Sequence, residues 1–65
     1  MPRLQISLEA ARVNAKLSQE DVAKKIGKSR QTIALWEAGK VKLDRANFYM
    51  LAEIYGLSID DIFLP

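Results

Sequence analysis

Apolar residues recur along this chain at spacings of three and four, the pattern of helices that bury one face. From this periodicity we predict five helices, at about Ser7–Asn14, Gln19–Ile26, Arg30–Ala38, Arg45–Tyr55 and Ile59–Phe63. No segment alternates apolar and polar residues over enough positions to predict a strand. The sequence therefore predicts an all-α fold without repeats or linkers.

Residue types that begin and end helices stand at the borders of these stretches. Candidate N-caps, whose side-chain oxygens accept a hydrogen bond from a free backbone N–H group, are Ser18, Ser29, Asp44 and Ser58. Asp21 and Asp61 follow two of these serines at the three-residue spacing of a capping box. Each of the three glycines, at positions 27, 39 and 56, follows a periodic stretch and indicates a helix end.

The inward faces of these helices supply the predicted core. It consists of Leu8, Ala11, Val22, Ala23, Ile26, Ile33, Trp36, Phe48, Leu51, Ala52, Tyr55, Ile59 and Ile62. Trp36 is a candidate for stacking on a nucleic-acid base, but its three-residue spacing from Ile33 favours a place in the core.

The length and composition narrow the class of protein. At 65 residues the chain forms one domain, residues 1–65, near the lower size limit for folding alone. It contains no Cys and no His, which excludes disulfides and ordinary zinc sites. No apolar run approaches the ~20 residues that span a bilayer, and the first five residues lack the apolar core of a signal peptide. We expect a complete short cytoplasmic protein of a bacterium or phage-infected cell, without membrane association.

The net charge of +2 is unevenly distributed. Residues 24–45 carry seven basic and two acidic side chains, whereas residues 46–65 carry three acidic side chains and no basic ones. A local excess of positive charge suits a phosphate-rich partner, although an ordinary solvated surface has a similar composition. For Lys24 and Lys25 we favour the solvated helix face.

The second and third predicted helices are joined by residues 27–29 alone. A turn of three or four residues that contains glycine, between helices crossing at a steep angle, describes a helix-turn-helix. Ala23 is small where the two helices approach most closely, and Gly27 permits the positive φ that the reversal requires. The sequence therefore predicts a helix-turn-helix motif over about residues 18–39.

These residues resemble the Cro/repressor-type (Xre-like) helix-turn-helix DNA-binding family over about residues 6–63. The segments that carry the resemblance are Leu17-Ser18-Gln19 through Gly27, Trp36-Glu37-Ala38-Gly39-Lys40 and Gly56-Leu57-Ser58. The resemblance implies a compact five-helix repressor-like domain that reads operator DNA, usually as a dimer. Two positions depart from the family pattern. Lys28 stands where an apolar residue is usual, and Leu43 stands where proline often precedes the fourth helix.

The start of the third helix is the predicted base-reading surface, because Ile33 turns inward and leaves the opposite face outward. The residues expected to contact bases in the major groove are Ser29, Arg30, Gln31 and Leu35, the same positions that the resemblance implies. Arg30 suits guanine and Gln31 suits adenine, each through two hydrogen bonds, while Leu35 suits the thymine methyl group. The alternative for Arg30 and Gln31 is helix surface without a role.

Other residues are candidates for the DNA backbone, where contacts position a protein without selecting sequence. Gln19 begins the second helix, whose free N–H groups and dipole favour a phosphate oxygen, and the resemblance assigns this position to the backbone. The remaining candidates are Asn14, Lys16, Lys28, Lys40 and Lys42. The resemblance also implies a partly buried ion pair between Arg12 and Glu37.

Several apolar residues near the fourth and fifth predicted helices exceed what the core needs. They are Tyr49, Met50, Ile54, Phe63 and Leu64. Single apolar residues on a surface are normal, but a gathered patch suits a symmetric dimer. Helix-turn-helix dimers bind related half-sites about one helical turn apart. We therefore expect a homodimer, at least on DNA, and an operator with two-fold symmetry.

The expected function is sequence-specific binding of double-stranded DNA in transcriptional regulation, as a repressor. The alternative is a protein-interaction module, such as an antitoxin-like subunit, and salt-dependent affinity for duplex DNA separates the two. The sequence contains no metal-ligand set, glycine-rich phosphate-binding loop or nucleophile with a histidine base. We therefore expect no enzymatic activity, no cofactor and no small-molecule ligand.

Overall fold

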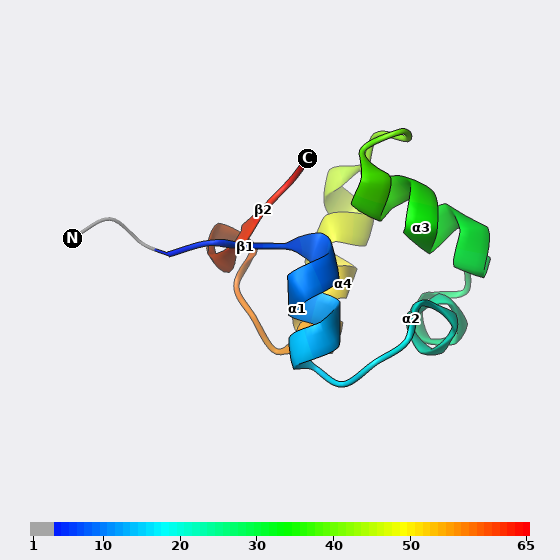
Figure 1. Cartoon of the computed structure of the whole chain (residues 1–65), viewed down its shortest axis with the longest axis horizontal. Helices are drawn as coiled ribbons and strands as arrows, with labels where there is room; N and C mark the ends of the chain where they lie inside the picture. Colours follow the sequence, from blue (N-terminus) through cyan, green and yellow to red (C-terminus); the bar gives the residue numbers. More distant parts are fainter. Residues whose placement is uncertain (1–3) are drawn as a thin grey trace.

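The computed structural model describes residues 4–65 (Figure 1). Within this range the elements are β1 (Ile6–Ser7), α1 (Leu8–Asn14), α2 (Gln19–Ile26), α3 (Arg30–Ala38), α4 (Arg45–Tyr55), the 3₁₀ helix η1 (Ile59–Asp61) and β2 (Ile62–Phe63). Figure 1 shows α2 and α3 at one end of the molecule and the two strands toward the other, with α1 and α4 between them.

Local capping explains where the helices begin. The bounds of α2, α3 and α4 are those that the sequence predicts, and each of the four predicted N-caps accepts a hydrogen bond from a backbone N–H group of its helix. The capping boxes at Ser18 and Ser58 are both formed. α1 begins one residue later than predicted, because the Ser7 hydroxyl accepts a hydrogen bond from the Ala10 N–H group at 3.0 Å and is itself the N-cap.

The prediction of a fifth α-helix at Ile59–Phe63 is wrong. The helical part is a single 3₁₀ turn, and the chain then extends as β2. The last two residues of the predicted helix, Ile62 and Phe63, are β-branched and aromatic, types that suit a strand better than a helix end. The five-helix architecture is therefore replaced by four α-helices, a 3₁₀ turn and a pair of strands within residues 4–65.

The prediction that the chain contains no strand is also wrong. β1 and β2 pair in parallel, with Ile6 opposite Ile62 and Ser7 opposite Phe63. The extended backbone before α1 satisfies hydrogen-bonding groups of the C-terminal segment that would otherwise need water or a helix. Strands of two residues are too short to show an alternating pattern, so the sequence gives no sign of them.

One core lies between the helices and β2. Its buried residues are Leu8, Ala11, Val22, Ala23, Ile26, Ile33, Trp36, Leu43, Leu51, Ala52, Tyr55 and Ile62. The sequence predicts all of these except Leu43, whereas Phe48 and Ile59, which it also predicts, are only partly buried. Leu43 is 8% exposed, so its side chain fixes the connection before α4 by packing into the core. A proline at this position would fix it by restricting the backbone instead.

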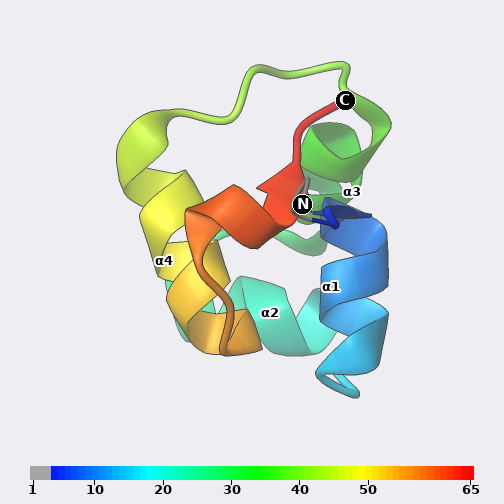
Figure 2. The same cartoon turned by 90° about the vertical axis from the view of Figure 1, so that its left-hand side faces the viewer.

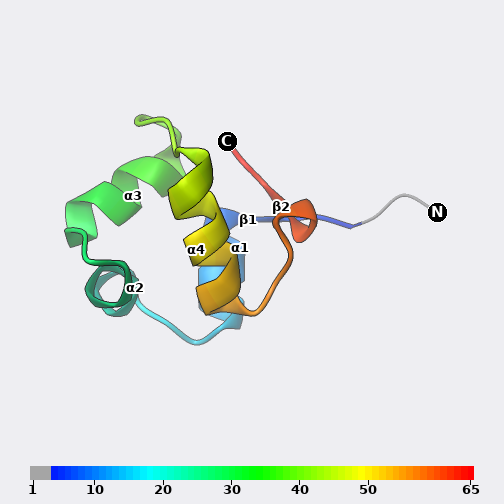
Figure 3. The same cartoon turned by 180° about the vertical axis from the view of Figure 1, so that it is seen from behind.

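The figures show which surfaces remain open. In Figure 2, α1 and α4 lie on opposite sides of the molecule, with η1 and β2 in front of them. Figure 3 shows α4 in front, with α2 and α3 extending to one side of it, away from the strands. No helix within residues 4–65 is long and apolar enough to cross a membrane.

Candidate nucleic-acid interface

The turn between α2 and α3 occupies residues 27–29. Gly27 has a φ of +74°, a left-handed conformation that costs glycine little and other residues more. The backbone N–H groups of Gly27 and Lys28 both donate to the carbonyl oxygen of Ala23, at 2.9 Å for Lys28. Ser29 then caps α3, so the chain reverses direction and starts a new helix within three residues.

Buried side chains fix α2 against α3. Val22, Ala23 and Ile26 are buried on α2, and Ile33 and Trp36 are buried on α3. Since the two α3 residues are three positions apart, they share one face of that helix. The opposite face of α3 therefore points away from the core, and the first turn of the helix exposes side chains there.

The candidate base readers lie on the first two turns of α3. Arg30 and Gln31 are exposed, and neither side chain forms a hydrogen bond or ion pair with another residue in the described range. The Ser29 hydroxyl is engaged, because it accepts a hydrogen bond from the Thr32 N–H group at 3.1 Å and lies 2.9 Å from Thr32 Oγ1. Leu35 is half-buried one turn further along. Arg30 and Gln31 are therefore the two whose polar groups are free for a ligand.

Behind this surface, Glu37 joins three segments of the chain. Its Oε2 lies 2.7 Å from Arg12 Nε of α1, and its Oε1 accepts a hydrogen bond from Gln19 Nε2 of α2 at 3.0 Å. Arg12 Nη1 also donates to the carbonyl oxygen of Leu17 at 2.9 Å. One polar network thus connects α1, the chain before α2, the start of α2 and the end of α3.

The Arg12–Glu37 pair is shielded from water, because the two side chains are only 12% and 7% exposed. The hydrogen bond to Glu37 raises the pKa of Arg12 above its ordinary value, against the opposing effect of burial. Arg12 therefore remains charged at every pH at which the fold persists. A pair of this kind fixes geometry more than it adds stability, but losing one partner leaves a buried charge uncompensated.

The hydrogen bond from Gln19 to Glu37 is the contact that sequence reasoning misses. The two residues are 18 positions apart, and no periodicity links the start of one helix to the end of the next. The bond occupies one of the two N–H groups of the Gln19 amide and leaves the second for another acceptor. Gln19 is therefore held in place by the same carboxylate that holds α1 against α3.

The other candidates for the DNA backbone flank α3 on both sides. Asn14 and Lys16 lie where α1 ends and the chain turns toward α2, and Lys16 has a φ of +61°. Lys28 precedes α3, whereas Lys40 and Lys42 follow it. All five are exposed. Since the nine residues of α3 span about 13 Å, these lysines lie near opposite ends of the helix.

The residues of the predicted dimer patch do not share one face. Tyr49, Met50, Phe63 and Leu64 are each more than 40% exposed, and Ile54 is half-buried. Leu64 lines a groove together with Phe48, which lies on the inward side of α4. Because successive helix residues turn by about 100°, Met50 projects about 200° around α4 from Phe48. The body of α4 therefore separates Met50 from Leu64.

Comparison with known proteins agrees with this geometry. A helix-turn-helix family model matches residues 8–62. An uncharacterized HTH-type transcriptional regulator of Methanocaldococcus jannaschii is 46% identical over 48 residues, covering 74% of this chain and 73% of the relative. One from Archaeoglobus fulgidus is 34% identical over 53 residues, covering 82% and 75%. No solved structure matches this chain significantly. The matched region contains all four α-helices and the turn between α2 and α3, so the chain belongs to the Xre-like helix-turn-helix family.

Proposed function

We propose that this chain is a transcriptional regulator, acting as a repressor, that binds double-stranded DNA in a sequence-specific way. The first turn of α3 enters the major groove, the docking mode of helix-turn-helix proteins. The names of the relatives, HTH-type transcriptional regulators, support this function. The observation that carries the proposal is the exposed, uncommitted pair Arg30 and Gln31 on a helix whose other face is locked into the core.

Arg30 and Gln31 supply base recognition. A guanidinium donates two hydrogen bonds to guanine O6 and N7, and an amide bonds adenine N6 and N7. Each such pair discriminates against a wrong base by roughly 1–3 kcal/mol. Leu35, one turn along, packs on a thymine methyl group, and Ser29 contributes at the edge of the groove while it caps α3.

Contacts to phosphate set the register of α3 in the groove. The free N–H group of the Gln19 amide and the backbone N–H groups at the start of α2 bind one phosphate. Lys28 binds near the first turn of α3, and Lys40 and Lys42 bind beyond its last turn. Because Glu37 holds the Gln19 amide, this phosphate contact is positioned before DNA binds.

The test begins with affinity for random-sequence duplex DNA at several salt concentrations. We expect a linear fall of log K with log salt, with a slope of about −0.9 for each phosphate neutralised. Selection from a random pool then yields a binding motif. The double variant Arg30→Ala/Gln31→Ala loses that motif and keeps the salt-dependent affinity, whereas the control Lys25→Ala, on the solvated side of α2, keeps both.

Two results would contradict the proposal. If the wild-type protein ignores duplex DNA even at low salt, the chain is a protein-interaction module of the same fold, such as an antitoxin-like subunit. If the double variant selects the same motif as the wild type, DNA is the ligand but Arg30 and Gln31 do not read it.

A further inference from the structure

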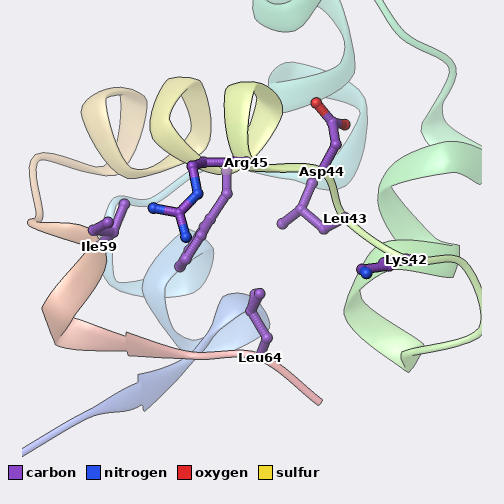
Figure 4. Close-up of a pocket in the computed structure, with 7 residues that line it drawn as sticks. Lys42, Leu43, Asp44, Arg45, Ile59 and Leu64 are labelled. Carbon is purple, nitrogen blue, oxygen red and sulfur yellow. The ribbon is translucent and has the colours of Figure 1, made fainter.

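An open apolar groove lies between the connection from α3 to α4, the start of α4 and the C-terminal segment (Figure 4). Its volume is about 640 Å³, and its apolar lining comes from Leu43, Phe48, Ile59 and Leu64. Figure 4 shows the side chains of Leu43 and Leu64 directed toward each other across the groove. Phe48 and Ile59 are half-buried and Leu64 is 41% exposed, so the fold leaves this apolar surface partly open to water.

A second hollow continues the groove toward the end of α3. It has a volume of about 290 Å³ and lies beside Trp36 and Pro65. The two hollows share Lys42, Leu43 and Leu64 in their linings, so they adjoin. A site for a small molecule usually encloses most of its ligand. An open row of adjoining hollows instead suits an extended or helical peptide that places successive side chains in them.

Two unpaired cations line this groove. Lys42 belongs to both hollows, and Arg45 belongs to the larger one. Neither side chain forms an ion pair or hydrogen bond with another residue in the range 4–65. Figure 4 shows the Arg45 guanidinium toward Ile59 and Lys42 on the side of α3. The two positive charges therefore flank the apolar lining.

The acidic residue between these cations, Asp44, is occupied elsewhere. Its carboxylate accepts hydrogen bonds from the Asn47 backbone N–H group at 3.2 Å and from the Asn47 side-chain amide at 2.6 Å. Figure 4 shows this carboxylate pointing away from Leu64. Among its lining residues, the groove thus offers two free cations and no free carboxylate.

We propose that this groove binds an acidic peptide segment of a partner protein. Two apolar side chains of the peptide occupy the adjoining hollows, and its carboxylates lie beside Arg45 and Lys42. The apolar contacts supply affinity, and the complementary charges select the partner. DNA does not fit the groove, because burying polar phosphate and sugar against an apolar lining costs free energy.

Lys42 belongs both to this groove and to the candidate contacts with the DNA backbone. One ammonium group pairs poorly with two anions at once, so the peptide and DNA should each weaken the binding of the other. By thermodynamic linkage the two effects are equal. This coupling rests on the proposed function, whereas peptide binding itself does not.

Selection from phage-displayed random peptides of about 12 residues, on the immobilised wild-type protein, tests the proposal, because multivalent display retains weak binders. We expect the enriched peptides to combine acidic residues with a pair of apolar ones. Synthetic copies of these peptides should shift the amide NMR signals of residues 42–48 and 59–65. The signals of α2 should stay in place, since Figure 2 shows α2 on the opposite side of the molecule from the connection between α3 and α4.

Charge reversal tests the role of Arg45. Arg45→Glu should weaken the binding of a selected peptide by at least about tenfold, measured by calorimetry, because it places like charges together. A glutamate at the first position of α4 suits the helix dipole, so the helix remains folded. Replacing the acidic peptide residue that faces position 45 by lysine should restore the affinity for this variant. The control Lys25→Glu makes the same change of net charge at an exposed position on α2 and should alter the affinity less than about twofold.

Removal of apolar lining tests the hollows themselves. Leu64 borders both of them and is 41% exposed, so Leu64→Ser changes the groove with little effect on the core. We expect this variant to weaken peptide binding by at least about tenfold while its circular dichroism spectrum stays that of the wild type.

Three results would overturn the peptide site. They are a selection that enriches no acidic peptide, an affinity that Arg45→Glu leaves unchanged, and signals of the groove that shift with protein concentration alone, which would make a second copy of the chain the occupant. All three are measured without DNA, so they leave the proposed function standing. A protein that binds acidic peptides in this groove but ignores duplex DNA contradicts the proposed function alone.

Discussion

At one end of the molecule, a three-residue connection joins α2 to α3 and a partly buried polar network holds them in place, whereas at the other end two strands from opposite parts of the chain pair. The first end holds the shielded Arg12–Glu37 pair and the seam of α2 against α3. The second holds Ile6 opposite Ile62 and an exposed hydrogen bond from Gln5 Nε2 to the Asp60 carbonyl oxygen, at 3.1 Å.

The difference indicates a division of labour between the two ends. A recognition helix must be held in a defined orientation, and shielded, hydrogen-bonded charges provide this because every misplacement leaves a charge unpaired. The strand pair closes the core with one buried side chain, Ile62, and backbone hydrogen bonds. We expect the first end to respond to the loss of polar partners and the second to respond to the loss of apolar volume.

The largest combined effect, on stability and on DNA affinity, should follow from breaking the network. Glu37→Ala leaves the partly buried Arg12 charge without its partner and should lower the free energy of unfolding by up to about 3 kcal/mol, measured by urea denaturation. It also frees the Gln19 amide, so affinity for DNA should fall in the fraction that remains folded. Glu20→Ala is the control, because its carboxylate lies 3.9 Å from Lys24 on the open surface and should matter by less than about 0.5 kcal/mol. Equal effects of the two changes would refute the role of the network.

The strand end is tested by removing apolar volume. Ile62 is 3% exposed and Phe63 is 47% exposed, although they are neighbours on β2. Ile62→Ala should cost roughly 2–4 kcal/mol of stability, and Phe63→Ala less than about 1 kcal/mol, in the same urea measurement. A small cost for Ile62→Ala would mean that β2 is not part of the cooperative core.

Alkaline pH tests the link between α4 and the network. Burial, with a contribution from Glu37, raises the pKa of Tyr55 to about 12. The unfolded chain loses this proton near pH 10, so the stabilisation is complete below pH 10 and is lost as the pH rises toward 12. Between pH 10 and pH 12, the free energy of unfolding of the wild type should fall by about 2 kcal/mol more than that of Tyr55→Phe, measured by urea denaturation at each pH. Parallel curves for the two proteins would show that Tyr55 titrates normally.

The smallest effect concerns the contact between the C-terminus and the end of α3. Gly27 and Gly39 both have a φ of +74°, but a Cβ at Gly39 would lie 3.0 Å from Pro65 Cβ, while one at Gly27 would meet nothing within 4 Å. Gly27→Ala and Gly39→Ala should each lower the free energy of unfolding by about 1 kcal/mol, because alanine is strained in the left-handed conformation. Gly39→Ala should lose up to about 1 kcal/mol more, and deletion of Pro65 should remove that excess. If the two variants lose the same stability in the protein that retains Pro65, Pro65 does not pack against the end of α3.

Much of the fold and part of the candidate interface can be predicted from the sequence. The bounds of α2, α3 and α4 follow from caps and glycines that act within a few residues. Leu43 and the two strands are missed, because their environments depend on segments distant in the sequence. The same holds for the contact between Gln19 and Glu37, which join only when α2 and α3 cross. The roles of Arg30, Gln31 and the lysines remain predictions.

The sequence by itself determined the helix borders, the sharp turn at Gly27 and the apolar seam of the helix-turn-helix, because caps, glycine and helical periodicity act within a few residues. Only the tertiary structure decided that residues 62–63 form a strand, that Glu37 holds both Arg12 and Gln19, and that Met50 and Leu64 lie on different sides of α4. These features depend on which backbone and side-chain groups meet after the chain has folded. That information resides in long-range packing, which the local pattern of a single sequence does not contain.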